Sequence, residues 1–215
     1  MKIKFFLLIL LTLFAFDSNP THANETNYYY VYGRNHLFKV YTPDNWINDI
    51  ELAHSVGIAV LFHPRLEVLK NSQPTDIYIY AQGWDVKASG ATLEQFIKED
   101  TQRFKSQHQN SIVSQIPFKY EGHDGIIKAV YNRFEQLNGL YEDCVYFETD
   151  KSVITVVYSG VNAALYSRFK PTFDEFLSKF QFVSSDPATI AKILEEDKKL
   201  RPNARSYPIR ENKGQ

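Results

Sequence analysis

The sequence predicts an α/β fold of the α+β kind, in which several short strands and a few helices form one domain. Two segments place apolar residues at helical spacing, around 92–105 and 162–180. Hydrophobic residues make up 44% of the 215-residue chain and aromatic residues 15%, which is enough for one full core. Eight further runs are rich in β-branched or aromatic residues and are flanked by turn residues. These predicted strands are 28–32, 37–41, 57–62, 76–82, 111–118, 125–134, 140–149 and 152–158.

The first 23 residues have the three-part layout of a secretory signal peptide. Lys2 and Lys4 precede an apolar run at 5–16, and a polar stretch then ends in Ala23. As a helix the apolar run spans ~18 Å, short of the ~30 Å core of a membrane, so we expect cleavage after Ala23. An uncleaved N-terminal anchor is the alternative. No cysteine lies near this point, so we expect a secreted or periplasmic protein that is not a lipoprotein and has no stable membrane insertion.

Charge and cysteine content narrow the class of protein. The chain has 24 basic and 25 acidic residues, so no global field attracts nucleic acid. Cys144 is the only cysteine, which excludes an internal disulfide. We expect it to be a small buried hydrophobe in a strand, with a reactive thiol as the alternative. The neighbouring Glu142 and Asp143 raise the pKa of a thiol, which disfavours reactivity.

The N-terminal half contains a predicted hairpin and one well-alternating strand. A turn at 33–35 joins the first two strands, and Trp46 follows in an irregular stretch. Residues 65–75 are expected to form a loop with a weak turn of helix. In the strand 76–82 isoleucines occupy one face, and Tyr78 and Tyr80 occupy the other. Because both faces are apolar, we expect both to be covered.

The helical segments carry capping signals. Thr92 and Gln95 fit a capping box for the helix 92–105, and its apolar stripe consists of Leu93, Phe96, Ile97 and Phe104. Asn162 caps the second helix. Pro171 lies inside that helix and predicts a break or kink near 169–170. An edge strand is expected at 181–183.

A boundary at 184–187 precedes a weakly amphipathic helix at 188–200 and a basic tail. Residues 198–215 carry six basic side chains and one Glu. We expect a solvated tail. A docking arm for an acidic partner or a lipid surface is the alternative.

No motif for catalysis or for phosphate or metal binding is present. The sequence has no GxGxxG, GxxxxGK[ST] or GxSxG, and no two histidines of the expected mature chain are three or four residues apart. His123 beside Asp124 could act as a base, but turn chemistry explains the pair better. We therefore predict no catalytic, cofactor or metal residues, while a site formed by distant histidines stays open.

Exposed aromatic and basic residues are the candidates for partner binding. Aromatic side chains are favoured at interface cores, although core packing is the alternative for each of them. The candidates are Tyr28, Tyr30, Trp84, Lys198, Lys199, Arg201 and Arg205.

The order of elements resembles the PsbP-like superfamily, which includes the photosystem II extrinsic subunit and a yeast Ran-binding import factor. An entry strand leads through a proline turn to a Trp at 38–46, a helix starts at 92–94, and the strand 152–158 precedes a closing segment at 173–182. The resemblance covers about residues 30–183. It implies an α/β/α sandwich around a mostly antiparallel sheet of about six strands, and a non-enzymatic binding, assembly or chaperone-like role. The chain departs from cytoplasmic members in its signal peptide and from all members in its basic tail.

The expected organisation is therefore a signal peptide at 1–23, a PsbP-like domain at 24–185 and a helical, then basic, tail at 186–215. The leading function is an exported module that docks a protein partner of unknown identity, without a cofactor. A small-ligand or metal-binding protein is the second hypothesis. An undetected hydrolase using His123, Asp124 or Cys144 is the third.

Overall fold

The structure, a computed structural model, describes residues 28–69, 72–86, 90–120, 125–137 and 139–202, and the backbone of 207–208. The predicted signal peptide, His123, Asp124 and Arg205 lie outside the described residues. The strands are β1 (Tyr28–Tyr32), β2 (Leu37–Tyr41), β3 (Trp46–Asn48), β4 (Val60–Pro64), β5 (Ile77–Trp84), β6 (Ser111–Ile116), β7 (Lys128–Gln136), β8 (Tyr141–Glu148), β9 (Val153–Gly160), β10 (Gln181–Ser184) and β11 (Tyr207–Pro208). The helices are α1 (Ile50–Ser55), α2 (Leu66–Leu69), the 3-10 turn η1 (Pro74–Asp76), α3 (Leu93–Gln107), α4 (Ala163–Lys179) and α5 (Pro187–Leu200).

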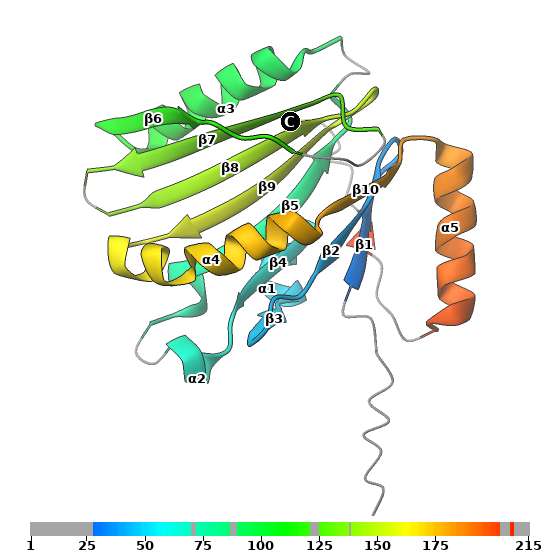
Figure 1. Cartoon of the computed structure of the whole chain (residues 1–215), viewed down its shortest axis with the longest axis horizontal. Helices are drawn as coiled ribbons and strands as arrows, with labels where there is room; N and C mark the ends of the chain where they lie inside the picture. Colours follow the sequence, from blue (N-terminus) through cyan, green and yellow to red (C-terminus); the bar gives the residue numbers. More distant parts are fainter. Residues whose placement is uncertain are drawn as a thin grey trace, which may run out of the picture.

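A seven-stranded sheet forms the centre of the fold (Figure 1). Its order is β3-β4-β5-β9-β8-β7-β6, and every neighbouring pair is antiparallel. This confirms the predicted α+β class with mostly antiparallel pairing. The sheet has one strand more than the expected six or so, because Trp46 begins β3 and does not lie in an irregular stretch.

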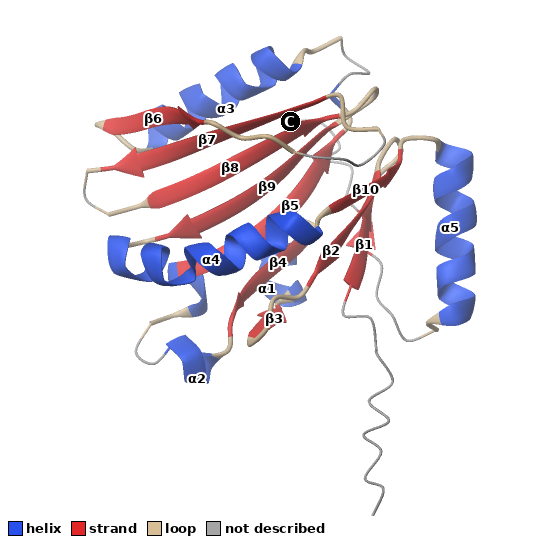
Figure 2. Cartoon of the chain, in the orientation of Figure 1, coloured by secondary structure: helices blue, strands red, loops and turns tan. Residues whose placement is uncertain are grey.

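A second sheet of four strands lies beside the first, in the order β10-β2-β1-β11 (Figure 2). The predicted hairpin is confirmed, with Tyr28 opposite Tyr41 and Tyr32 opposite Leu37. β10 is the expected edge strand. The tail contributes β11, which pairs in parallel with β1 through Val31 and Tyr32.

Helix α4 packs against both sheets. Phe169, Phe173 and Leu177 lie on its buried face, in one cluster with Phe38 of β2 and Ile79 of β5. Aromatic and aliphatic side chains of this size dominate the apolar area buried in a core. This cluster therefore joins the four-stranded sheet to the seven-stranded one.

Of the break or kink predicted in the second helix, the break is wrong, because α4 is continuous through Pro171. Asn162 caps it as predicted, accepting a hydrogen bond from the Leu165 amide at 2.9 Å. Pro171 lies on the exposed side, so the carbonyl of Ser167, which loses its amide partner, can bond to water. Phe169 and Phe173 on the opposite side are held by the core.

Helix α3 covers the other face of the seven-stranded sheet. Along β8, Val145 and Phe147 point to the α4 side, whereas Cys144 and Tyr146 join Leu93 in the α3-side cluster. The predicted N-cap is confirmed, since the side chain of Thr92 accepts from the Gln95 amide. The sheet is therefore covered by helices on both faces, as the predicted sandwich requires.

Helix α5 covers the outer side of the four-stranded sheet. Ile190 is buried against Tyr30 and Leu37, and Ile193 and Leu194 pack around them. The amphipathic pattern of 188–200 is therefore satisfied within the chain. Its N-terminus is capped by Asp186, whose carboxylate accepts from the Thr189 amide at 2.8 Å.

The segment between β3 and β4 differs from the prediction. Residues 50–55 form the short helix α1, and β4 starts at Val60, three residues later than the predicted strand at 57–62. Gly57 has a φ of +77°, a left-handed conformation that favours glycine and ends the helix. As a result, α1 lies beside β4 on the α3 side of the sheet and leaves a gap before α3.

Candidate partner-binding recess

Two tyrosines of β5 face the gap between α1 and α3. Tyr78 and Tyr80 are only half-buried, whereas Ile77 and Ile79 on the opposite face are fully buried. The prediction that both faces of this strand are covered is therefore only partly met on the tyrosine side. Tyr80 packs against the α3-side cluster and Trp84 against Phe96, whereas Tyr78 and Tyr80 also line an opening beside α1.

The gap contains an open depression of about 360 Å³, which we call the recess. Leu52 and Val56 come from α1 and the residue after it, and Val56 is 59% exposed. Leu61 of β4 lies opposite Tyr80 and contributes to the floor. Ile58, Thr75 and Tyr78 complete the lining. The recess is therefore apolar, with two tyrosine rings at its base.

Strand register places a carboxylate next to these tyrosines. Ser159 of β9 is opposite both Tyr78 of β5 and Glu142 of β8, so the three side chains form one row on the α3 side. The next row contains Tyr80, Val157 and Cys144. Glu142 thus lies on the same face of the sheet as the recess, with β9 between it and Tyr78, although it is not one of the residues that line the recess.

Burial, and then the charge of Asp100, raise the pKa of Glu142 to about 7. Asp100 lies on α3, where it accepts hydrogen bonds from Tyr146 and Arg103. The charge of Arg103 lowers the pKa of Glu142, yet the net shift remains upward. A partly buried carboxylate with a raised pKa beside a depression is a feature of functional sites.

This arrangement can bind an apolar side chain together with a positive charge. An aliphatic or aromatic group entering the recess displaces water from the tyrosine rings and from Leu52 and Val56. A cation beside it relieves the repulsion between Glu142 and Asp100. No nucleophile with an adjacent base lies among the lining residues.

Tyr28, Tyr30 and Arg201, three of the residues predicted from the sequence to bind a partner, lie together but contact one another. Arg201 lies 3.7 Å from the ring centroid of Tyr28 and donates to both carboxylate oxygens of Asp197 at 2.8 Å. It also donates to the Tyr28 carbonyl at 3.1 Å. Tyr30 is buried beneath them. This cluster fastens the end of α5 to β1.

The other predicted partner residues lie elsewhere. Trp84 ends β5 on the α3 side, where its ring packs against Phe96 and its indole N–H donates to Thr155. Lys198 and Lys199 are exposed on the last turn of α5, and Lys199 pairs with Glu195. A role for any of these residues in partner binding stays a prediction.

Two histidines are buried and paired with carboxylates. The Nδ1 atom of His36 lies 3.0 Å from Asp85, and the Nε2 atom of His63 lies 3.2 Å from Asp49. Within the described residues no group of three or more His, Cys, Asp or Glu side chains could hold a metal ion. His54 lies in the last turn of α1 and is exposed to solvent.

Cys144 is buried in β8, as expected. Burial, followed by the charge of Asp100, raises the pKa of its thiol. The predicted direction is confirmed, although burial rather than the neighbouring carboxylates is the first cause. A thiol in this setting is a poor nucleophile.

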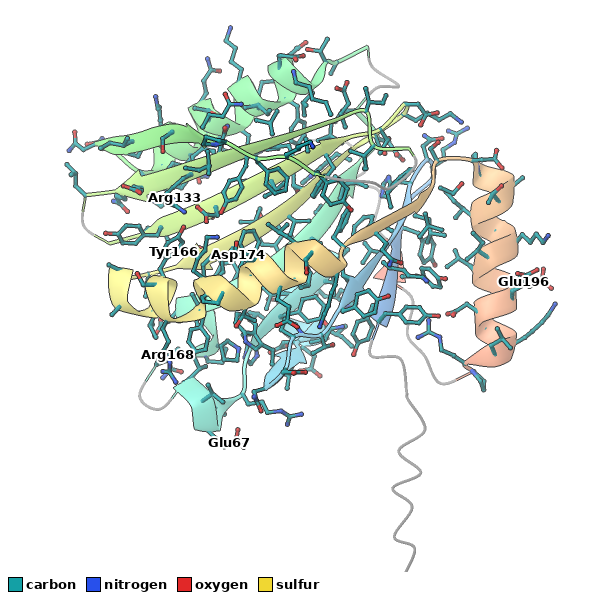
Figure 3. All side chains as sticks on the ribbon, viewed as in Figure 1. Glu67, Arg133, Tyr166, Arg168, Asp174 and Glu196 are labelled. Atoms are coloured by element: carbon teal, nitrogen blue, oxygen red, sulfur yellow. The ribbon has the colours of Figure 1, made fainter. Side chains whose placement is uncertain are left out.

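The α4 side of the sheet contains an ion pair between Asp143 and Arg133, and Figure 3 shows Arg133 near Tyr166 of α4. Asp143 is fully buried and accepts from Arg133 at 2.8 and 3.2 Å, and from the Tyr131 hydroxyl. The guanidinium of Arg133 lies 5.6 Å from the ring centroid of Tyr166 on α4. Every polar contact of Asp143 is internal, so the cluster is a structural link between β7, β8 and α4.

The recess was not predictable from the sequence. The alternation of Tyr78 and Tyr80 indicated an apolar outer face, and Glu142 shares a row of the sheet with Tyr78 only through a pairing of strands that the sequence does not reveal. Tyrosine in place of isoleucine on that face was the available hint, because a hydroxyl-bearing ring suits a half-exposed surface.

No helix within the described ranges is long and apolar enough to cross a membrane.

No family model matches the sequence. The comparison with curated proteins also finds no match. Among solved structures, the fold is similar to the solution structure of cyanobacterial PsbP (CyanoP) from Synechocystis sp. PCC 6803. The TM-score is 0.45 at 17% sequence identity, over 68% of this chain and 86% of that chain.

Proposed function

We propose that this protein is a non-enzymatic binding module that acts outside the cytoplasm and docks a protein partner in the recess. The observation that carries the proposal is an open, largely apolar depression with the partly buried Glu142 nearby on the same face of the sheet. The partner presents an apolar anchor side chain flanked by Lys or Arg.

The apolar part of the recess supplies the affinity. Interfaces draw most of their binding energy from a few anchors that fill desolvated pockets, and tyrosine is enriched at such positions. Tyr78 and Tyr80 are held in register by β4 and β9, so the floor is preformed. A preformed floor reduces the entropy lost on binding.

The carboxylates near the recess supply the charge preference. Glu142 and Asp100 repel each other, and this repulsion contributes to the raised pKa of Glu142. A cation beside them is attracted by both carboxylates, whereas an acidic partner adds to the repulsion. Charge complementarity therefore selects a basic segment.

Export and the absence of catalysis rest on the sequence. The signal-peptide pattern at 1–23 supports a secreted or periplasmic location. The absence of any recognised catalytic motif, and the internal pairing of Asp143 and of the buried histidines, supports a binding role.

The test is capture of the partner with and without a change in the recess. The full chain is expressed with a tag in its own organism, crosslinked and analysed by mass spectrometry. Val56→Asp places a charge at the rim on an exposed side chain, so folding is preserved and the partner is lost. Leu66→Asp changes a side chain of similar exposure on α2 and retains the partner.

Equal recovery of a discrete partner by the wild type and by Val56→Asp would place the interface elsewhere. A partner lost equally with both variants would assign the effect to surface hydrophobicity in general. Failure of the wild type to recover any partner would contradict the binding role itself.

A small apolar ligand is the second candidate, because the recess volume of about 360 Å³ lies in the range of ligand pockets. Native mass spectrometry of the protein purified from its own organism tests it. A retained small molecule that is absent from Val56→Asp supports this candidate, and a bare protein mass argues against it.

A further inference from the structure

Strand β6 forms one edge of the seven-stranded sheet, and its outer side is open. All six residues pair with β7, from Ser111 opposite Gln136 to Ile116 opposite Tyr131. No strand in the described part of the chain pairs with the outer side of β6. In an antiparallel edge the N–H and C=O groups of alternate residues point outward and are free to bond to another strand.

The edge lacks the features that normally prevent such pairing. Its sequence, SIVSQI, contains no charged residue and no proline, and its register with β7 has no bulge. Ile112 is 56% exposed on it. Pro117 follows immediately and ends any ladder there. The opposite edge, β3, is only three residues long.

We propose that β6 pairs antiparallel with β6 of a second copy of this chain, around a two-fold axis at Ser114. The proposal goes beyond the proposed function, because the recess lies at β4 and β5, towards the other end of the sheet. The two seven-stranded sheets then form one continuous sheet.

The two-fold axis restricts the register. It carries each face of the sheet onto itself, so residues that lie opposite each other differ by an even number of positions. With the axis at Ser114, Ile112 lies opposite Ile116 of the second copy, and Val113 lies opposite Gln115. The exposed Ile112 thereby gains an apolar cross-strand partner in both halves of the dimer.

A depression lies where Ile112 of the second copy arrives. A pocket of about 480 Å³ is lined by Ile116, Pro117 and Phe118 together with Tyr131. Ile116 belongs to the α4-side cluster, and Ile112 shares its face by alternation. An axis at Val113 instead pairs Ile112 with Ser114 and leaves this pocket unfilled. The apolar match therefore selects the axis at Ser114 and a second copy as the occupant.

The test measures the oligomeric state of the full chain by sedimentation over micromolar to millimolar concentrations. Ser114 is exposed, so its substitution leaves the core unchanged. Ser114→Lys places two lysines opposite each other at the axis and weakens the dimer about fivefold or more. Ser114→Glu does the same, and an equal mixture of the two variants restores the dimer because opposite charges then meet.

Covalent capture tests the register independently. Ser114→Cys forms a disulfide-linked dimer under mild oxidation, whereas Ile127→Cys, at an exposed position before β7, does not. The native Cys144 is buried and does not interfere. A monomer at all concentrations, or equal crosslinking at positions 114 and 127, would overturn the proposal. Lysine and glutamate variants that stay apart when mixed would overturn the register.

Discussion

Glu142 of β8 and Tyr78 of β5 lie on the same side of the seven-stranded sheet, with β9 between their strands, because both pair with Ser159 of β9. The carboxylate therefore lies on the same surface as the tyrosine rings of β5. Burial there, and then the nearby Asp100, raise its pKa to about 7. A site of apolar and acidic character results from strand register alone.

Glu142 makes the stability of the fold depend on pH between about 4.5 and 7. In this window the folded protein binds a proton that the unfolded chain, with a pKa of 4.5, does not. Stability is therefore highest below the window and falls as the pH rises through 7. Glu142→Gln removes this slope and stabilises the protein at pH 8 by about 1–3 kcal/mol. Urea denaturation at several pH values measures both effects.

The control for that measurement is Glu67→Gln, an exposed carboxylate on α2. It leaves the slope between pH 4.5 and 7 unchanged. An unchanged slope in Glu142→Gln would show that another group titrates in this window.

The contact between His36 and Asp85 joins the turn after β1 to the end of β5. Burial raises the pKa of Asp85. The hydrogen bond and charge of His36, together with hydrogen bonds from the Asn35 and Arg34 amides, lower it by more than burial raises it, so the net shift is downward. Its stabilising effect is therefore present above the unfolded pKa of 3.8 and is lost as the pH falls through the folded pKa. Asp85→Asn destabilises the protein at pH 7 by about 2 kcal/mol.

Thermal unfolding at pH 7 and at pH 3 checks this prediction. The difference between the variant and the wild type is smaller at pH 3, since protonation of Asp85 then begins to remove the same interaction from the wild type. A constant difference at both values would mean that packing of the side chain, not its charge, is responsible.

Arg201 fastens α5 to β1 through two hydrogen bonds to Asp197 and through the ring of Tyr28. Lysine retains the charge but not the planar fork that makes the paired bonds. Arg201→Lys is expected to cost about 1–2 kcal/mol and to increase hydrogen exchange in α5. Lys199→Ala, at a 70% exposed position on the same turn, leaves the exchange unchanged. Equal hydrogen exchange of α5 in the two variants would show that Arg201 does not hold α5 on β1.

The buried Asp143 depends on Arg133 for its charge balance. Arg133→Met keeps much of the side-chain volume but leaves the carboxylate with Tyr131 and a lysine 3.9 Å away. We expect a loss of about 3 kcal/mol in the free energy of unfolding. Arg65→Met, at an exposed position, changes it by less than about 0.5 kcal/mol. A small loss in Arg133→Met would show that Tyr131 and Lys170 suffice.

Local patterns predicted the elements that depend on local interactions. Thr92 and Asn162 were identified as caps because their side chains bond to amides three residues on. Cys144 was placed in a buried strand because a free cysteine generally behaves as a small hydrophobic residue, and it lies buried in β8. The break at Pro171 was wrongly predicted because the packing of Phe169 and Phe173 on one side of α4 outweighs the lost amide.

Features that depend on long-range pairing were not accessible from the sequence. The hairpin of β1 and β2 was predicted, but its membership of a separate sheet depends on β10, about 140 residues further along the chain. The recess likewise requires the register of three strands and the unpredicted helix α1, which ends at Ser55, two residues before Gly57.

The most direct measurement of the central claim is site-specific photocrosslinking from the recess. A photoreactive residue replaces Val56 in one version of the chain and Leu66 in another, and both are expressed in the protein's own organism. A discrete protein adduct from position 56 that is absent at position 66, and that Glu142→Gln weakens, is the predicted result. No adduct at position 56, or the same adducts at both positions, would contradict the assignment of the recess as the docking site.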